Sequence, residues 1–454
     1  MRLEQNGDFS QGNIMRILLR LAIPMTMAQL INVLYNVVDR MFIGRIGGAS
    51  MDALTGVGVC LPMISMMIAF ANLVGTGGAP LFSIERGRKN EAEAEGLLGN
   101  SVTLLLLFAV ILTVFGLIFK RPLLMLLGAS EVTLPYADQY MTTYLFGTVF
   151  VMLSLGLNNF INAQGFARIG MCTVAIGAGM NIVLDPLFIF VLQMGVRGAA
   201  IATVISQFAA AAWTIRFLTG KKALIRIRYD CMRLKKKRVK KMLALGLSGF
   251  TMSVTNSVVQ MVCNATLQLH GGDIYVGIMT IINSVREIIS LPVSGFTSAG
   301  QPVMGYNYGA KAYDRVKRTI RNLGTIMILY TLAVWGLVSA LPHLFIRLFG
   351  GNGEMLTLGI PSMHIYFFGF FFMAFQFIGQ CTFTALGKPK RAMFFSIFRK
   401  IVIVVPLTLL LPAVRGLGVH GVFWAEPISN AVGGLACFIT MMLTIYRKLG
   451  KEPV

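Results

Sequence analysis

The hydrophobic positions of this chain fall into twelve long stretches separated by short polar connections. Each stretch has the length of about 20 apolar residues, or more, that an α-helix needs to cross the hydrocarbon core of a bilayer. Too few residues lie outside them to form a soluble domain. The pattern predicts an all-α polytopic membrane protein with twelve transmembrane helices, near residues 15–43, 52–82, 97–119, 132–163, 169–194, 198–219, 238–269, 274–303, 316–341, 354–385, 392–413 and 418–446.

The second half of the chain repeats features of the first at an offset of about 222 residues. The segment PLFSIERGRK begins at Pro80 after the second stretch, and PVMGYNYGAK begins at Pro302 after the eighth. The same offset relates Gly165 to Gly387. Within one residue, it also relates the glycine pair before the sixth stretch to the pair before the twelfth (Gly195 and Gly198, Gly418 and Gly421).

These matches predict two pseudo-symmetric six-helix bundles. Six is an even number of crossings, so both halves enter the membrane from the same side and are related by an axis along its normal. The expected domains are an N-terminal lobe at residues 1–219, a basic cytoplasmic linker at 220–240 and a C-terminal lobe at 241–454. Two such bundles suit alternating access.

Composition and charge placement support a membrane protein. Only 13% of the residues are charged, against about 25% in a typical soluble domain. Of the 40 Lys and Arg residues, 30 lie in the N-terminal arm, the even-numbered connections and the C-terminus. This asymmetry follows the positive-inside rule and predicts cytoplasmic N- and C-termini. The dense basic segment at 221–241 is expected to lie against anionic headgroups, with no nucleic-acid partner.

The N-terminal residues and the cysteines argue against a targeting segment, a disulfide framework and a zinc site. The polar first thirteen residues, with Glu4 and Asp8, lead directly into the first apolar stretch, so we expect no cleavable targeting segment. The six cysteines show no CxxC or His-linked spacing, so neither a disulfide framework nor a zinc site is expected.

Asp185 is the only charged residue between Met171 and Met194, and Asn181 lies one helical turn before it. A carboxylate at bilayer depth is costly, and it usually faces a protein cavity where it handles ions or protons. A buried structural hydrogen bond to a neighbouring helix is the alternative.

Other polar residues fall on helix faces in the first half. In the first stretch they form one stripe at i, i+3, i+4 and i+7 (Asn32, Tyr35, Asn36 and Asp39). The fourth and sixth stretches add Asn158, Asn159, Asn162, Thr203 and Gln207. Side chains facing lipid would stay unsatisfied, so we expect these residues to converge inside the first half.

Two carboxylates with amide and hydroxyl oxygens can do one of two tasks. When both are ionised, Asp39 and Asp185 could hold Na⁺; alternatively, one of them could carry a proton. A static hydrogen-bonded network that joins the helices is the competing interpretation.

The second half has polar stripes with a different charge inventory. The seventh and tenth stretches carry uncharged residues (Asn256, Gln260 and Asn264; Gln376, Gln380 and Thr384). The eighth carries Asn283, Arg286 and Glu287, and the twelfth carries Glu426. Glu287 adjoins Arg286 and points away from it on a helix, so Glu426 is the better partner for Arg286. Glu287 could instead attract a cationic substrate.

Arg399 and Lys400 lie inside the eleventh stretch. Long basic side chains can extend towards the membrane interface. We expect this of Lys400 in particular.

The chain resembles the multidrug and toxic compound extrusion (MATE) family, and its bacterial MepA-like branch in particular. The resemblance covers essentially the whole chain. It rests on the stripe that ends at Asp39, the NxxxDP of 181–186, the paired loops at 80–89 and 301–311, and GVRGAAIATVISQ at 195–207.

The resemblance implies two six-helix lobes around a V-shaped cleft and export of organic cations and amphipathic drugs, driven by H⁺ or Na⁺ entry. Family members with a first-lobe cation site use residues that correspond here to Asp39, Asn181, Asp185 and Thr203, with Tyr35 and Asn158 at flanking positions. Some members use a glutamate in the seventh helix instead. The seventh stretch here has no acidic residue, which favours the first-lobe site.

Together these observations predict a cation-coupled multidrug antiporter in the bacterial cytoplasmic membrane. It would need no cofactor beyond H⁺ or Na⁺, and it would act as a monomer on small-molecule drugs. Asp39, Asn181 and Asp185 would be metal ligands only with Na⁺ coupling. Asn256, Gln260, Asn283, Glu287 and Gln376 are candidate substrate-binding residues.

Other functions remain as alternatives. The nearest is a lipid or lipid-linked saccharide flippase of the same superfamily, which should show a more cationic cleft. An enzyme is not expected, because the four histidines form no HExxH or paired set and no nucleophile–base arrangement is visible. A cation channel is disfavoured, because no stretch carries a filter-like loop.

Overall fold

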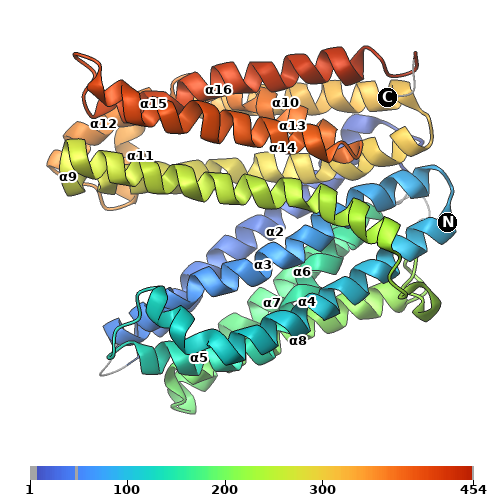
Figure 1. The fold of residues 1–454 in the computed structure, drawn as a ribbon, viewed down its shortest axis with the longest axis horizontal. Coiled ribbons are helices and arrows are strands. Elements are labelled where there is room, and N and C mark those ends of the chain that lie inside the picture. The colour runs from blue at the N-terminus through green and yellow to red at the C-terminus, as the bar shows by residue number, and fades with distance from the viewer. Residues whose placement is uncertain (1–7, 47–49, 452–454) are drawn as a thin grey trace. The chain divides into compact units, whose positions relative to one another are not determined.

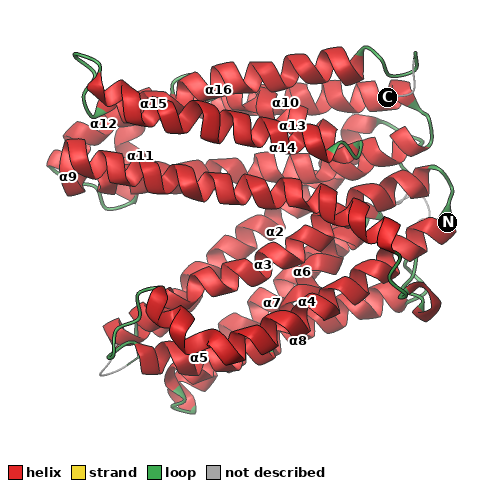
Figure 2. Cartoon of the chain, viewed as in Figure 1, coloured by secondary structure: helices red, strands yellow, loops and turns green. Residues whose placement is uncertain are grey.

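The computed structural model describes residues 8–46 and 50–451. Glu4 and the outer ends of the first and last predicted domains lie outside these ranges. Within them the secondary structure is helical, with no strand (Figure 2).

The described residues divide into two compact units. The first unit holds residues 8–9 and 23–246, and the second holds residues 10–22 and 247–451. The first unit is built from most of α2 (Ile14–Ile43), and from α3 (Ser50–Gly87), α4 (Glu91–Leu126), α5 (Leu134–Phe146), α6 (Thr148–Ala163), α7 (Ala167–Pro186), the π-helix η1 (Leu187–Val191), α8 (Gly195–Thr219) and the short η2 (Tyr229–Cys231) (Figure 1).

The second unit is built mainly from the elements that follow η2 in the chain. It contains most of α9 (Lys236–Gly309), and α10 (Tyr313–Ala340), α11 (Pro342–Leu348), α12 (Glu354–Phe367), α13 (Phe372–Ala385), α14 (Pro389–Ile397), the π-helix η3 (Phe398–Val404), α15 (Val405–Leu410), η4 (Leu411–Ala413), α16 (His420–Met441) and η5 (Met442–Tyr446).

The helices account for the predicted membrane crossings. Nine segments of the described chain are long and apolar enough to span a bilayer, and two bent pairs, α5 with α6 and α12 with α13, make eleven. The 74-residue α9 counts as one of these, but it is interrupted at Gly272, whose φ of 69° lies in the region that favours glycine. Division of α9 at Gly272 gives the twelve crossings that the hydrophobic pattern predicts.

The internal repeat is also visible in the backbone. The equivalent loop residues Lys89 and Lys311 have φ values of 58° and 56°. The two bent pairs also correspond, since the breaks lie at Gly147 and at residues 368–371 and bend by 57° and 48°. The prediction of a twelve-helix protein with two pseudo-symmetric bundles is therefore confirmed.

The first helix of each half begins in the other unit. Helix α2 belongs to the second unit up to Ala22 and to the first from Ile23. Helix α9 belongs to the first unit up to Gly246 and to the second from Leu247. Pro24 and Gly246, which are 222 residues apart, lie next to the two positions where the chain passes from one unit to the other, here called the crossing points.

The start of the third helix of each half holds these exchanged segments. At the start of α4, Glu93 accepts hydrogen bonds from Arg238 Nε (3.0 Å) and Nη2 (2.7 Å), near the start of α9. At the equivalent position in α10, Arg315 donates to the carbonyl oxygens of Gly12 and Gln11, both at 3.1 Å. Glu93 and Arg315 thus anchor the chain just before each crossing point.

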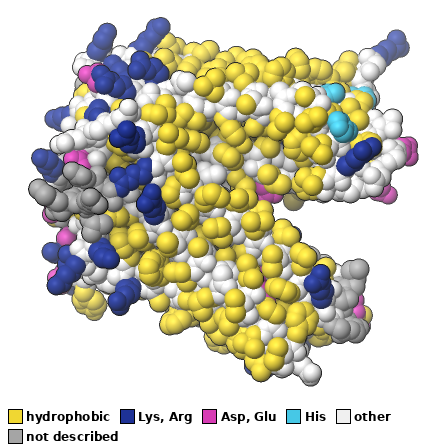
Figure 3. Space-filling model, turned by 180° about the vertical axis from the view of Figure 1, so that it is seen from behind, with side chains coloured by type: hydrophobic (Ala, Val, Ile, Leu, Met, Phe, Trp, Pro, Cys, Tyr) yellow, Lys and Arg dark blue, Asp and Glu magenta, His cyan; other side chains and the backbone are white. Residues whose placement is uncertain are grey.

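The surface of each unit matches a bilayer environment. Hydrophobic side chains cover the middle of each unit, whereas Lys and Arg side chains gather at one end (Figure 3). Large apolar side chains such as Ile118, Val183, Leu329 and Leu410 are more than 60% exposed. Exposure of this extent is unfavourable in water and favourable in lipid.

Candidate functional site

The predicted site in the first unit is assembled from three helices. Asp39 lies in the last turns of α2, Asn181 and Asp185 lie on one face at the end of α7, and Thr203 lies in α8. Pro186 follows Asp185 and is succeeded by the π-helix η1. Short π-helical stretches interrupt the regular ladder and occur frequently at functional sites.

Asn181 joins α7 to α8 by hydrogen bonds. Its Nδ2 donates to Asp185 Oδ1 at 3.1 Å and to Thr203 Oγ1 at 3.3 Å. Thr203 Oγ1 donates to the carbonyl oxygen of Ala199 at 3.0 Å, so its hydroxyl proton is already used. Asn181, Asp185 and Thr203 are all buried. The Thr203 oxygen therefore acts as an acceptor towards the site.

The side chains of Asp39 and Asp185 lie close enough to influence each other electrostatically. Neither acid takes part in any ion pair found in residues 8–46 and 50–451. Three buried oxygens lack a hydrogen-bond partner in the same ranges, namely Asp39 Oδ1, Asp185 Oδ2 and Asn181 Oδ1. Buried acceptors are normally satisfied, so this cluster needs a proton or a cation.

The site adjoins a cavity of about 560 Å³ in the first unit. Tyr35, Asp39 and the basic residue Arg40 line it, and further polar lining includes Asn32, Asn36, Tyr140, Tyr144 and Gln207. Tyr140 and Tyr144 are not among the residues predicted from the sequence. Their i, i+4 spacing in α5 was the available signal, since both rings lie on one face of the helix.

Asn158 is separate from this group of contacts. Its Nδ2 donates to the carbonyl oxygen of Gly170 at 3.2 Å, near the start of α7. Asp39 and Asp185 receive no hydrogen bond from Asn158 in the described part of the chain. The structure therefore brings together Tyr35, Asp39, Asn181, Asp185 and Thr203, and leaves Asn158 in a helix-packing contact.

The donor set of this cluster consists only of oxygens. Two carboxylates, an amide oxygen and a hydroxyl are hard ligands, which suit Na⁺ or a proton rather than a transition metal. The described residues contain no group of three His, Cys, Asp or Glu side chains that could hold a metal ion. The residues fit a monovalent cation.

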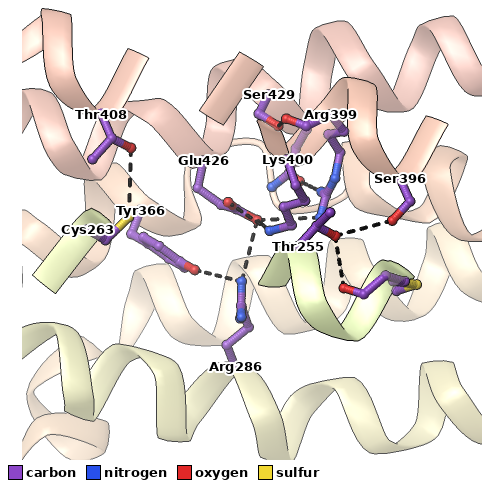
Figure 4. Close-up of polar contacts among 12 residues, drawn as sticks. Thr255, Cys263, Arg286, Tyr366, Ser396, Arg399, Lys400, Thr408, Glu426 and Ser429 are labelled. Atoms are coloured by element: carbon purple, nitrogen blue, oxygen red, sulfur yellow. Dashed lines mark hydrogen bonds and ion pairs between the residues drawn. The ribbon is translucent and has the colours of Figure 1, made fainter. Parts of the chain in front are cut away.

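Charged residues of the second unit form a separate cluster (Figure 4). Arg286 Nη1 lies 3.5 Å from Glu426 Oε1, as expected from its position, and donates to Tyr366 Oη at 3.0 Å. Lys400 Nζ donates to the two oxygens of Glu426 at 3.0 and 3.2 Å. The expectation that Lys400 extends to the cytoplasmic interface is therefore wrong. The ion pair with Glu426 holds its ammonium group inside the unit.

The candidate substrate-binding residues do not share one location. Asn256, Gln260 and Asn283 line a small cavity of the second unit. Glu287 is exposed and Gln376 is buried, and neither lines this cavity. Arg286 and Lys400 are among the charged residues around the cavity. The three amides therefore lie beside basic side chains, which disfavours the binding of a cationic substrate there.

Two repeated six-helix units with polar side chains at bilayer depth define a polytopic membrane transporter. The family model MatE matches residues 24–187 and 250–410. The chain belongs to the MatE family of multidrug transporters.

Similar proteins cover almost the whole chain. Multidrug export protein MepA of Staphylococcus haemolyticus (strain JCSC1435) is 25% identical over 446 residues, which is 98% of this chain and 96% of that protein. A crystal structure of MATE in the bent conformation superposes with a TM-score of 0.91 at 23% identity, covering 99% of both chains. MATE in the straight conformation gives 0.89 at 24% identity, with 97% and 98% covered.

Proposed function

We propose that the protein is a cation-coupled multidrug antiporter, with Asp39 and Asp185 as the coupling acids. The observation that carries the proposal is the proximity of the half-buried carboxyl group of Asp39 in α2 to the buried carboxyl group of Asp185 in α7, with neither acid in an ion pair of the described chain. Like charges this close are unfavourable in a low dielectric unless a cation or proton compensates them. Occupancy by H⁺ or Na⁺ therefore changes the energy of this site strongly.

The coupling acts through helix α2. Its start belongs to the second unit, and its Asp39 end belongs to the first. Pro24 lies at the crossing point and weakens the helix there, because it cannot donate the usual backbone hydrogen bond. Neutralisation of the acids lets α2 repack about Pro24 and favours the state that releases the drug. Cation and drug need only prefer different states for exchange to occur.

The substrate class follows from the cavity beside Asp39. A volume of about 560 Å³ is within the range of small-molecule sites. Tyrosine rings, amides, the carboxylate of Asp39 and the guanidinium of Arg40 line it together with aliphatic side chains, and the tyrosine rings and the carboxylate suit amphipathic organic cations. The name of the MepA relative supports export of drugs.

The proposed setting is the cytoplasmic membrane of a bacterium, with both termini in the cytoplasm. The excess of Lys and Arg in the even-numbered connections supports this orientation. The proposed domains are a lobe at 1–219, a linker at 220–240 and a lobe at 241–454. The proposed functional unit is a monomer, because both repeats lie in one chain.

Transport by purified protein in liposomes tests the proposal. Ethidium movement is measured with a pH gradient and a Na⁺ gradient imposed separately, which also identifies the coupling ion. We expect Asp39→Asn and Asp185→Asn to reduce gradient-driven transport to background. Asp273→Asn, which changes an exposed carboxylate of the second unit, should transport normally. Undiminished transport by both site variants would refute the coupling role.

A lipid or lipid-linked saccharide flippase is the second candidate, and the basic cluster around Glu426 is the observation that favours it. The cavity beside that cluster is only about 30 Å³, too small for a pyrophosphate headgroup with its sugar. Stimulation of ATP-independent lipid scrambling by the same liposomes, with no ethidium transport, would support the flippase.

A further inference from the structure

One place in the second unit holds more positive than negative side-chain charge. Arg286 in α9 and Arg399 and Lys400 in η3 all lie near Glu426 Oε1 in α16, at 3.5, 3.7 and 3.0 Å. Figure 4 shows the basic side chains converging on this carboxylate from separate helices. No second acid takes part in these ion pairs among the described residues. One carboxylate oxygen is thus shared by three cations.

Deprotonation cannot remove this imbalance. The two arginines stay protonated in proteins, so even a neutral Lys400 leaves a positive excess over Glu426. The side chains of Arg399 and Lys400 are only 9% and 5% exposed, so water compensates them poorly. A buried charge without a counter-charge is strongly unfavourable. The cluster therefore favours an additional negative charge close by.

The cluster also has hydrogen-bond donors to spare. Arg286 contacts Tyr366 and Glu426 through Nη1 alone. Its Nε and Nη2 groups have no partner in residues 8–46 and 50–451. Arg399 uses Nη1 on Asn430 and approaches Glu426 with Nη2. A guanidinium group carries five N–H donors, so both arginines could bind a further acceptor.

A small cavity lies against Arg286 and Lys400. It measures about 30 Å³ and is lined by Arg286, Lys400, Tyr366 and Glu426 together with three amides, Asn256, Gln260 and Asn283. A space of this size holds one or two water-sized groups. It accepts a single ion or a very small group, and it excludes the body of a drug.

We propose that this cavity of the second unit binds a small monovalent inorganic anion of the halide class. The basic side chains supply the attraction, and the amide N–H groups of Asn256, Gln260 and Asn283 can complete the coordination shell. The anion offsets the positive charge that Glu426 leaves uncompensated. This site is independent of the coupling role of Asp39 and Asp185.

Thermal unfolding of the purified full-length protein tests the proposal. Sodium bromide and sodium chloride are titrated at constant ionic strength against sodium gluconate, whose anion is too large for the cavity. We expect a saturable rise in the unfolding temperature with both halides. Arg286→Gln should weaken the apparent halide affinity about tenfold or more, since it removes a charged donor. Arg347→Gln, an exposed arginine, is the matched control and should leave the affinity unchanged.

Glu426→Gln tests the sign of the effect. Loss of the single carboxylate makes the cluster more basic, so halide should bind more tightly and stabilise this variant more than the parent protein. Equal unfolding temperatures of the parent protein in halide and gluconate would overturn the proposal. A saturable rise with formate but not with bromide would overturn the halide assignment and indicate a carboxylate site.

Variants that fill the cavity without changing charge keep the test decisive if Arg286→Gln or Glu426→Gln does not fold. Asn283→Leu replaces an amide that lines the cavity with an apolar side chain. Line broadening of the ³⁵Cl nuclear magnetic resonance signal reports exchange of chloride at a protein site. Bromide that competes for the same site should reduce this broadening. We expect Asn283→Leu to abolish the part of the broadening that bromide removes, and its retention would contradict the assignment.

Discussion

Helices α8 and α16 occupy equivalent places in the two units, yet the charges around them are opposite. At an offset of 223 residues, GVRGAAIATVISQ at 195–207 aligns with GVHGVFWAEPISN at 418–430, with six identities. Thr203 in the first aligns with Glu426 in the second. Thr203 accepts a hydrogen bond from Asn181, which also donates to the acid Asp185, whereas Glu426 faces three bases with no other acid in the described ion pairs.

This difference shows how one scaffold serves two electrostatic purposes. Small residues at shared positions keep the helix packing, and Ser206 and its counterpart Ser429 both donate to backbone carbonyl oxygens. The side chain at the variable position then decides the sign of the site. An acid-rich cluster favours a cation or proton, whereas a base-rich cluster favours an anion.

The largest effect is expected from transferring the second unit's acid into the first. Thr203→Glu places a third carboxylate next to Asn181, which already contacts Asp185. We expect transport to fall to background because this charge either repels both acids or holds the cation too tightly to release it. Thr203→Gln has nearly the same shape without the charge and should retain part of the activity. Liposome transport by the two variants makes the comparison, and equal activity would contradict it.

A stability measurement should give opposite signs in the two units. Glu426→Gln leaves three cations unpaired and should cost about 3–5 kcal/mol, as removal of one partner of a buried ion pair does. Asp185→Asn relieves repulsion from Asp39 and should leave the unfolding temperature unchanged or raise it. Both are measured in detergent without halide.

The double variant Glu426→Gln with Lys400→Met is the control for this interpretation. Removal of one cation together with the acid should recover part of the lost stability, because it reduces the uncompensated charge. A double variant that is less stable than Glu426→Gln alone would point to lost packing rather than charge.

Much of the fold was predictable from the hydrophobic pattern. The twelve stretches match the helices because membrane crossing demands long apolar segments, a constraint that acts locally along the chain. The bends in two crossings and the π-helices after Asp185 and at Arg399 were not predictable. They depend on how glycines and prolines interrupt the backbone ladder, and a span count does not resolve this.

The first-unit site was easier to predict than the second-unit cluster. A lone acid in an apolar helix, such as Asp185, needs a special environment, so the sequence itself marks it. Lys400 has two possible environments, the interface or a buried partner, and the sequence near it does not decide between them. The alignment of Thr203 with Glu426 could have decided between them. Because Thr203 belongs to the predicted site of the first unit, the alignment predicts that Glu426 is also inside its unit, where it can form an ion pair with Lys400.

The crossing points offer a smaller, steric comparison. A Cβ atom at Gly246 would lie 1.8 Å from the carbonyl oxygen of Leu73, which is backbone and cannot move aside easily. We expect Gly246→Ala to cost about 1–3 kcal/mol of stability and to slow transport, as over-packing does. Gly336→Ala, at a helical glycine with open space around it, should be neutral or slightly stabilising. Thermal unfolding of the two variants measures the difference.

The smallest effects are expected where Glu93 and Arg315 hold the exchanged helix starts. Arg238→Ala removes a partly exposed ion pair with Glu93, so it should cost about 1 kcal/mol or less. Arg315→Ala removes the bonds to the carbonyl oxygens of Gln11 and Gly12 and should cost a similar amount. Their local consequences should differ, and amide hydrogen exchange can separate them. Arg238→Ala should speed exchange at 236–246 and leave 13–22 unchanged, whereas Arg315→Ala should do the reverse. Faster exchange of both segments in either variant would mean that the two helix starts unfold together. Arg238 and Arg315 would then not stabilise their own helix starts independently.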